Sequence, residues 1–132
     1  MWWNRSKSKR SAKVKNKYSA SRVSHAGLSF MSKGEAACYD LLKLMELSGE
    51  LSDLKTQVTI RMTDADLRWI MDFSYFDNKK GCLVFADFKG FETERWAILK
   101  KLWPFYGPGP LVIYKMEPRL KRIFVHEEIN IK

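Results

Sequence analysis

Two apolar segments joined by a short polar turn constrain the fold of this chain more than any other feature. Residues 67–76 alternate in polarity and are rich in aromatic side chains, which is typical of a β-strand. The DNKKG sequence at 77–81 supplies turn-forming residues, and the run at 82–88 that follows is almost continuously apolar. We therefore predict an antiparallel hairpin whose second strand lies in the middle of a sheet and is covered on both faces.

A helix and a further strand precede this hairpin. Ser32 is a suitable N-cap, Gly49 is a suitable C-terminal stop, and the residues between them have helical periodicity. The apolar residues of this helix recur at the i, i+3, i+4 and i+7 spacing of one stripe: Cys38, Leu41, Leu42 and Met45. After Gly49 the chain turns, alternates as a strand around 58–61 and turns again at 63–66. With the hairpin, this strand gives a three-strand meander.

The remainder of the chain contains a second helix and a buried strand. Thr93 can cap a helix over 93–105, which we expect Pro104 and the GPGP sequence at 107–110 to end. Residues 111–116 form a short apolar strand that is reached through this helix and is therefore expected to run parallel to the strand before it. Residues 117–132 could add an edge strand. The predicted fold class is α/β, with a mixed sheet of about four strands flanked by helices.

The excess positive charge is confined to the first quarter of the chain. Residues 1–34 carry nine basic and no acidic residues, whereas residues 35–132 carry 15 of each, so the net charge of +9 arises entirely in the first segment. Residues 1–28 also lack helical or strand periodicity, and we interpret them as a basic flexible arm before a single domain at 29–132. Such an arm attracts polyanions, which favours nucleic acid as the partner. A solvated tail that only maintains solubility is the alternative.

Several classes of protein are excluded or disfavoured by composition. No run approaches the roughly 18 apolar residues that a membrane-spanning helix needs, so no membrane partner is expected. The first ten residues are charged without a following apolar run, unlike a secretory signal. Cys38 and Cys82 lack the spacing of a disulfide scaffold or a zinc site, which favours a reducing, cytoplasmic location.

Two acidic residues interrupt the apolar strands, where an unpaired carboxylate is costly. Asp72 lies within the first strand of the hairpin, and Asp87 lies near the end of the second, two residues before Lys89. Residues two apart on a strand share a face, and the hairpin can bring Asp72 and Asp87 together across the strand pair. Two close carboxylates require a proton or a cation between them, and oxygen ligands favour Mg²⁺ over zinc. Glu35 could join them if the first helix packs beside the meander.

These residues resemble the PD-(D/E)xK nuclease superfamily, with its restriction-endonuclease-like core. The resemblance rests on the order of Glu35, Asp72 and the Asp87-Phe88-Lys89 tripeptide in a helix, meander, helix and strand arrangement. It extends over residues 30–115 to a group of small phage-encoded nucleases that is similar to Holliday-junction resolvases. This sequence has Met71 where the name of the superfamily has proline.

The resemblance implies a Mg²⁺-dependent DNA endonuclease that hydrolyses phosphodiester bonds with a metal-activated water, with Mn²⁺ able to substitute. In this reading Glu35, Asp72 and Asp87 bind the metal, Lys89 acts at the nucleophile and Gln57 supports the site. The implied substrate is branched DNA such as a Holliday junction, and the implied assembly is a homodimer. The basic residues that we expect to contact DNA are Arg10, Lys13, Lys15, Lys17, Arg22, Lys33, Lys100 and Lys101.

Two alternatives stay open. A nuclease of the same fold could nick a specific sequence or process DNA ends. The protein could also be a non-catalytic, basic nucleic-acid-binding protein in which the acidic residues are structural. For Glu35 in particular, the Ser32-x-x-Glu35 spacing is that of a capping box, which would explain this residue without any catalytic role.

Overall fold

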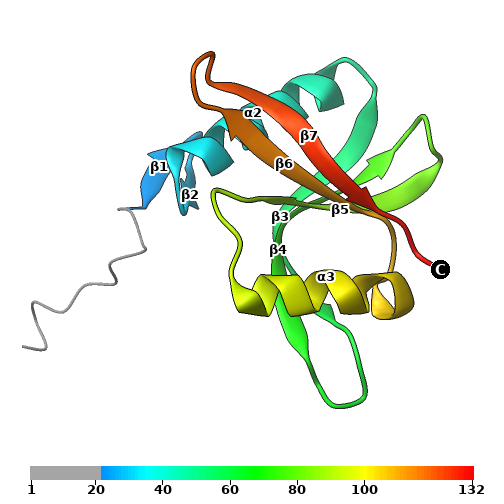
Figure 1. The fold of residues 1–132 in the computed structure, drawn as a ribbon. Coiled ribbons are helices and arrows are strands. Elements are labelled where there is room, and N and C mark those ends of the chain that lie inside the picture. Colours follow the sequence, from blue (N-terminus) through cyan, green and yellow to red (C-terminus); the bar gives the residue numbers. More distant parts are fainter. Residues whose placement is uncertain (1–21) are drawn as a thin grey trace, which may run out of the picture.

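The computed structural model describes residues 22–132, which form two helices, a five-stranded mixed sheet and a separate two-stranded hairpin (Figure 1). In chain order the elements are β1 (Val23–His25), β2 (Leu28–Phe30), α2 (Lys33–Leu47), β3 (Leu51–Arg61), β4 (Arg68–Asp77), β5 (Cys82–Phe88), α3 (Glu94–Tyr106), β6 (Leu111–Glu117) and β7 (Arg122–Ile129). The α/β class and the mixed sheet predicted from the sequence are confirmed. In the described part of the chain, no helix is long and apolar enough to cross a membrane.

The strands of the large sheet lie in the order β3-β4-β5-β6-β7. The first three form the predicted antiparallel meander, and β5 is the central strand. As expected for strands joined through a helix, β6 runs parallel to β5, with Phe85 opposite Leu111 and Asp87 opposite Ile113. The tail after residue 117 adds β7 as an antiparallel edge strand, so the sheet has five strands rather than about four.

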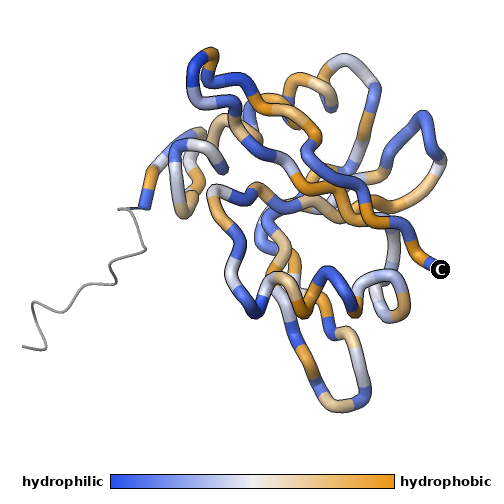
Figure 2. The backbone as a smooth tube through the Cα atoms, viewed as in Figure 1, coloured by the Kyte–Doolittle hydropathy of each residue, from blue (hydrophilic) through white to orange (hydrophobic). Residues whose placement is uncertain are grey.

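Helices α2 and α3 cover opposite faces of this sheet (Figure 1). Along β5, Val84 and Ala86 pack in the cluster beneath α2, whereas Phe85 packs in the cluster beneath α3 with Leu99 and Trp103. The middle of the sheet is accordingly hydrophobic (Figure 2). The continuous apolar run of β5 therefore reflects burial on both faces, as its sequence predicted.

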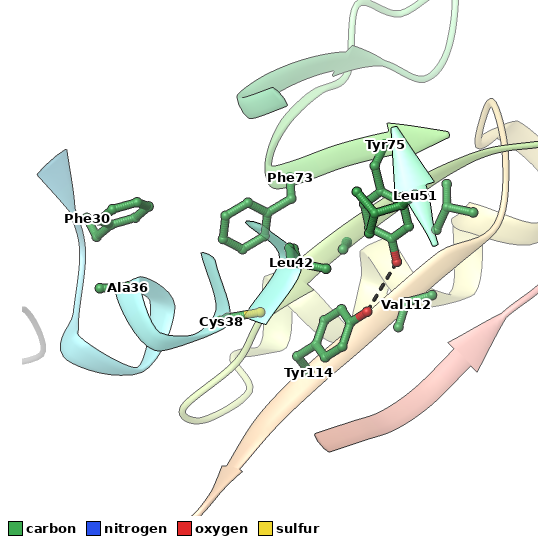
Figure 3. Packing of buried hydrophobic residues seen from close by; sticks show 11 residues of the cluster. Phe30, Ala36, Cys38, Leu42, Leu51, Phe73, Tyr75, Val112 and Tyr114 are labelled. Carbon is green, nitrogen blue, oxygen red and sulfur yellow. Dashed lines mark hydrogen bonds between the residues drawn. The ribbon is translucent and has the colours of Figure 1, made fainter. Parts of the chain in front are cut away.

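The α2-side cluster contains one buried polar contact. The hydroxyls of Tyr75 and Tyr114 lie 3.2 Å apart between the sheet and α2 (Figure 3). Burial raises the pKa of Tyr114 to about 12 and the pKa of Tyr75 still higher, so both phenols are neutral and can share a hydrogen bond. This pair joins β4 to β6 across the intervening strand.

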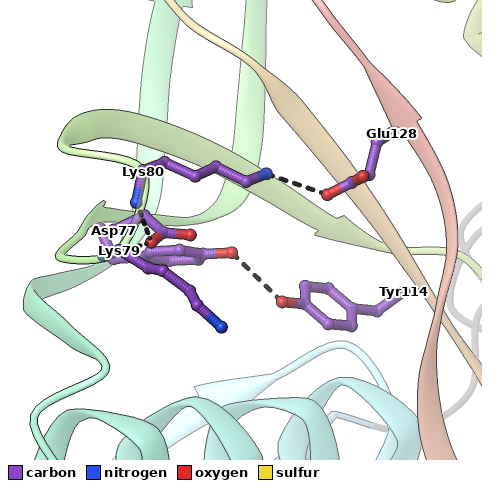
Figure 4. Close-up of polar contacts among 6 residues, drawn as sticks. Asp77, Lys79, Lys80, Tyr114 and Glu128 are labelled. Carbon is purple, nitrogen blue, oxygen red and sulfur yellow. Dashed lines mark hydrogen bonds and ion pairs between the residues drawn. The ribbon is translucent and has the colours of Figure 1, made fainter.

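The turn between β4 and β5 is fixed by a side chain. The Asp77 carboxylate accepts the backbone N–H groups of Lys79 and Lys80, both at 2.9 Å, as is common for aspartate in a turn (Figure 4). The Lys80 ammonium in turn forms a 3.0 Å ion pair with Glu128 on β7. These contacts set the register of the hairpin and hence the residues that face each other along it.

The N-terminal boundary of the domain differs from the predicted one. Residues 23–30 form the β1-β2 hairpin, with Ala26 and Gly27 at positive φ in its turn, although the sequence assigned residues up to 28 to the arm. The strands have only three residues each, too few for a periodic pattern to be detected. Phe30 anchors the hairpin in the core with 1% exposure. The rest of the proposed arm, residues 1–21, lies outside the described residues.

One other boundary was predicted incorrectly. Strand β3 begins at Leu51, well before the predicted 58–61, because buried Leu51 fills the α2-side core and a register shift between Ser52 and Lys55 lets the strand continue. Helix α3, in contrast, ends at Tyr106 before Gly107, within one residue of the predicted end, with Pro104 inside its last turn. The burial of Trp103 holds this last turn against the sheet and offsets the hydrogen bond that Pro104 cannot donate.

Candidate functional site

Asp72 and Asp87 exchange hydrogen bonds where the β4-β5 ladder ends. The last regular pair of this ladder is Phe73 with Ala86, so Asp72 and Asp87 are next in register. The backbone N–H of Asp72 donates to the Asp87 carboxylate at 3.0 Å, and the backbone N–H of Phe88 donates to the Asp72 carboxylate at 2.8 Å. Each side chain thus replaces a backbone acceptor of the neighbouring strand. The proximity expected from the hairpin is present.

The environment of these two carboxyl groups disfavours two negative charges. Asp87 is only 3% exposed. Burial, followed by the charges of Asp87 and Glu35, raises the pKa of Asp72 from its usual 3.8 to about 9. The same three carboxylates, after burial itself, raise the pKa of the Cys38 thiol far above its usual range. Burial and the neighbouring carboxylates therefore favour the protonated form of Asp72 when no metal ion is bound.

Lys89 completes one side of this site. Its ammonium nitrogen lies 2.7 Å from an Asp87 carboxylate oxygen and 4.2 Å from the centroid of the Trp96 ring. The backbone also fixes it, because the Lys89 N–H donates to the Tyr114 carbonyl on β6 at 3.0 Å. Asp87 and Lys89 are thus adjacent, as their spacing on the strand predicted. The cation is held between a carboxylate and an aromatic face.

Glu35 lies in the first turn of α2 and is 3% exposed. The Ser32 hydroxyl accepts the Glu35 N–H at 3.1 Å, which is half of the capping box considered above. The other half is absent, because the Glu35 carboxylate accepts the N–H of Met31 at 3.3 Å rather than that of Ser32. Its charge contributes to the raised pKa of Asp72, so Glu35 belongs to the electrostatic environment of the acidic pair.

A close contact between Gly34 and Phe88 sets the position of this helix turn. The Phe88 ring lies where a Cβ atom on residue 34 would be, so only glycine allows the ring to rest against the backbone of α2. Phe88 stands between Asp87 and Lys89, and Gly34 immediately precedes Glu35. This contact therefore determines how near Glu35 comes to the two strand residues.

Gln57 lies on β3 opposite Asp72. Its neighbours Thr56 and Val58 pair with Phe73 and Met71, which flank Asp72 on β4. Gln57 has a φ of 54°, a left-handed conformation that a residue other than glycine seldom adopts within a strand. Such outliers are concentrated at functional sites. The Gln57 side chain is exposed, and its supporting role stays a prediction.

The chemistry of the donors fits a hard divalent cation, but the three-carboxylate site implied by the resemblance is not assembled. Among residues 22–132, no three His, Cys, Asp or Glu side chains are arranged to hold a metal ion. Glu35 is directed to the Met31 amide, which leaves Asp72 and Asp87 as the available pair. Mg²⁺ commonly binds one or two carboxylates together with water and substrate phosphates, so two carboxylates are within the usual number of protein ligands for this ion.

The basic residues expected to contact DNA lie in three different parts of the chain. Arg22 and Lys33 line a pocket beside Phe88, next to the acidic pair. Lys101 is exposed on α3, whereas Lys100 is ion-paired with Glu92 at 2.9 Å and with Glu127 at 3.0 Å. The arm residues lie outside the described part of the chain: Arg10, Lys13, Lys15 and Lys17.

Trp96 is a site residue that the sequence analysis did not select. It lies on the buried face of α3 with Leu99 and Trp103, and it is only 3% exposed. Its ring nevertheless faces Lys89, and its buried indole N–H has no hydrogen-bond partner among residues 22–132. The short connection from Lys89 to the Thr93 N-cap is the signal that could have located it, because the first turn of α3 must then lie near the end of β5.

Comparison with known families places this chain in one of them. The chain belongs to the family described as protein of unknown function (DUF1064), whose profile matches residues 15–107. The match includes Glu35, Asp72, Asp87 and Lys89 and ends directly after α3. No curated protein and no solved structure matches this chain.

Proposed function

We propose that this protein is a Mg²⁺-dependent endonuclease that hydrolyses phosphodiester bonds in DNA. The observation that carries the proposal is the contact between Asp72 and Asp87 at the end of the β4-β5 ladder, with the Lys89 ammonium 2.7 Å from Asp87. Two adjacent carboxyl groups, one of which has a raised pKa, beside a positioned cation are a pattern of catalytic sites. We further propose that the mixed sheet is a restriction-endonuclease-like core, which rests on the resemblance described above.

Each residue of the site has a definite part in this proposal. Asp72 and Asp87 bind the cation through their carboxylate oxygens, in place of the proton that Asp72 otherwise holds. A Mg²⁺ ion held by Asp72 and Asp87 would supply the positive charge needed to activate a water molecule and to offset the charge of the phosphate. Lys89, held between Asp87 and Trp96, donates hydrogen bonds to the reacting phosphate group. Glu35 and Gln57 shape the site from α2 and β3.

The direct test is a cleavage assay with purified full-length protein. The substrates are a labelled four-way junction, a nicked duplex and a linear duplex of the same sequence, each with Mg²⁺ or with EDTA. We expect cleavage only with Mg²⁺ and the fastest cleavage for the junction, which the proposed preference for branched DNA requires. The Asp87→Asn variant should lose about a hundredfold or more in rate. Asp64→Asn, which changes an exposed acid in the 63–66 turn, is the matched control and should cut normally.

The assay also separates the alternatives. Equal cleavage of linear duplex and junction would favour a sequence-specific or end-processing nuclease. DNA binding by fluorescence anisotropy without cleavage under any condition would contradict the nuclease and favour a non-catalytic binding protein. The proposed homodimer, which the resemblance implies, predicts twice the chain mass in analytical ultracentrifugation.

A further inference from the structure

A pocket with a volume of about 780 Å³ lies beside the candidate site. Its walls come from the first described residues, the first turn of α2 and the ends of β5 and β6. Phe88, which lines it, stands between Asp87 and Lys89 in the chain and donates its backbone N–H to Asp72. Phe88 thus contributes its ring to the pocket and its backbone N–H to the acidic pair. Its volume is in the range of small-molecule binding sites.

The walls of this pocket combine apolar surface with positive charge. Val23, Phe88 and Met116 provide the apolar surface, and Arg22 and Lys33 provide two cations, whereas no acidic residue lines it. Arg22 is held in place, because its guanidinium donates to the Ser29 hydroxyl at 2.8 Å and to the Ser29 carbonyl at 3.1 Å. A ligand with an apolar planar part and an anionic part would match this lining.

Charge decides between the two nearest candidate occupants. Arg22 lines the pocket, and residues 1–21, which precede it in the sequence, carry seven Lys and Arg residues and no acid. The two cations of the pocket would repel this positively charged segment. The pocket and the segment would, in contrast, both attract the same polyanion. The occupant with the complementary charge is therefore a nucleic acid strand rather than the protein's own N-terminal segment.

We propose that this pocket binds one unpaired nucleotide of a DNA strand. Its base lies against Phe88 and Met116, where stacking on an aromatic ring is tolerant of sequence. Its phosphate lies at Lys33, which forms no ion pair with any residue in 22–132, and at Arg22. This proposal rests on the proposed function, because it places the unpaired nucleotide next to the phosphodiester that is cut. It gives a physical reason for a preference for branch points, where bases are most easily unpaired.

The test measures binding and not cleavage, with the full-length protein in EDTA. The probe is a DNA three-way branch with one unpaired 2-aminopurine nucleotide at the branch point, and the reference probe has an abasic site there. We expect the base to increase affinity about tenfold, as one stacked base commonly does, and its fluorescence to change on binding. Met116→Ala should reduce this difference between the two probes without affecting the affinity for the abasic one.

A charge reversal tests the phosphate contact. Lys33→Glu places an acid in the first turn of α2, where it favours the helix, so folding is retained. Lys79→Glu makes the same change on the exposed turn at 77–81 and is the matched control. We expect Lys33→Glu to weaken binding of the unpaired-base probe several-fold more than Lys79→Glu does. Equal affinities for the two probes, or equal effects of the two reversals, would overturn the proposal.

The outcomes for the pocket and for the nuclease are distinguishable. Base-dependent binding in EDTA together with no cleavage in Mg²⁺ would refute the proposed function and leave a nucleotide-binding pocket. Mg²⁺-dependent cleavage without any base dependence would support the nuclease and refute the pocket proposal.

Discussion

The Lys89 ammonium rests on the face of the Trp96 indole, 4.2 Å from the ring centroid. The ring attracts the cation electrostatically and limits the directions in which the long side chain can point. The same ammonium nitrogen lies 2.7 Å from an Asp87 carboxylate oxygen. Because Lys89 directly follows β5 and Trp96 lies in the first turn of α3, the docking of α3 on the sheet controls where this positive charge lies.

Replacing Lys89 with methionine should abolish Mg²⁺-dependent cleavage while DNA binding persists. Methionine keeps much of the apolar stem that packs on Trp96 but removes the charge that acts on the phosphate. The matched control is Lys80→Met, which breaks the ion pair with Glu128 far from the acidic pair along β5. Cleavage rates and anisotropy on the same junction measure both effects. Retained cleavage in Lys89→Met would remove this lysine from the proposed mechanism.

The two buried tryptophans of α3 should respond differently to replacement by phenylalanine. The Trp103 indole N–H donates to the Gly109 carbonyl at 2.8 Å, whereas the Trp96 N–H has no partner within the described residues. Trp103→Phe would leave a buried carbonyl unsatisfied, and we expect it to lower the free energy of unfolding by about 1–3 kcal/mol more than Trp96→Phe. Urea unfolding of both variants measures this difference. Equal losses would mean that the Trp96 N–H is hydrogen-bonded in solution.

The stability of the protein in EDTA should fall as the pH rises from about 4 to 9. The pKa of Asp72 is raised from 3.8 to about 9 in the folded state, so the folded state binds more protons than the unfolded state in this interval. Melting temperatures of the wild type and Asp72→Asn, taken across this range, test the assignment. The variant lacks the titrating group and should show a shallower decline. If the two profiles run parallel, Asp72 is not the group responsible.

Addition of Mg²⁺ should counteract this loss of stability. A cation that binds only the folded protein raises its melting temperature, and its site competes with the proton on Asp72. We therefore expect a larger stabilisation by Mg²⁺ at pH 8 than at pH 5 for the wild type. Asp87→Asn removes one of the two carboxylates and should show little stabilisation at either pH. A similar Mg²⁺ effect in this variant would place the ion elsewhere.

A methyl group at residue 34 should disturb the site more than one at residue 90. Gly34→Ala places a Cβ against the Phe88 ring, which has to move, and such overpacking commonly costs about 1–3 kcal/mol. Gly90→Ala meets nothing within 4 Å and is the matched control. We expect Gly34→Ala to lower both stability and cleavage, because Glu35 and Phe88 shift with the ring. Calorimetry and the junction assay measure the two effects, and normal behaviour of this variant would contradict the inferred contact.

The parts of the fold that were predicted correctly are those specified by neighbouring residues. The 77–81 turn defines the β4-β5 hairpin and, with it, the register that places Asp72 opposite Asp87. Helix α2 was located from its N-cap, since the Ser32 hydroxyl accepts the Glu35 N–H as the sequence predicted. Local signals of this kind do not depend on the rest of the chain.

The features that escaped prediction depend on contacts between distant segments. The position of Glu35 follows from the packing of Phe88 on Gly34, and the contact between Trp96 and Lys89 follows from how α3 docks. No periodicity within one segment encodes such relationships. The same holds for Lys100, which was selected as a DNA contact from its place on α3 but is paired with Glu92 and Glu127. Tertiary packing decided each of these cases.

The parallel pairing of β5 with β6 makes the residues beyond the family profile indispensable. The profile stops at residue 107, yet Ile113 lies beside Asp87, and the Tyr114 carbonyl accepts the Lys89 N–H. A polypeptide cut at that boundary would leave one whole side of β5 as an open edge, available for aggregation. The smallest piece of this protein able to maintain its acidic pair is therefore larger than the region by which its relatives are recognised.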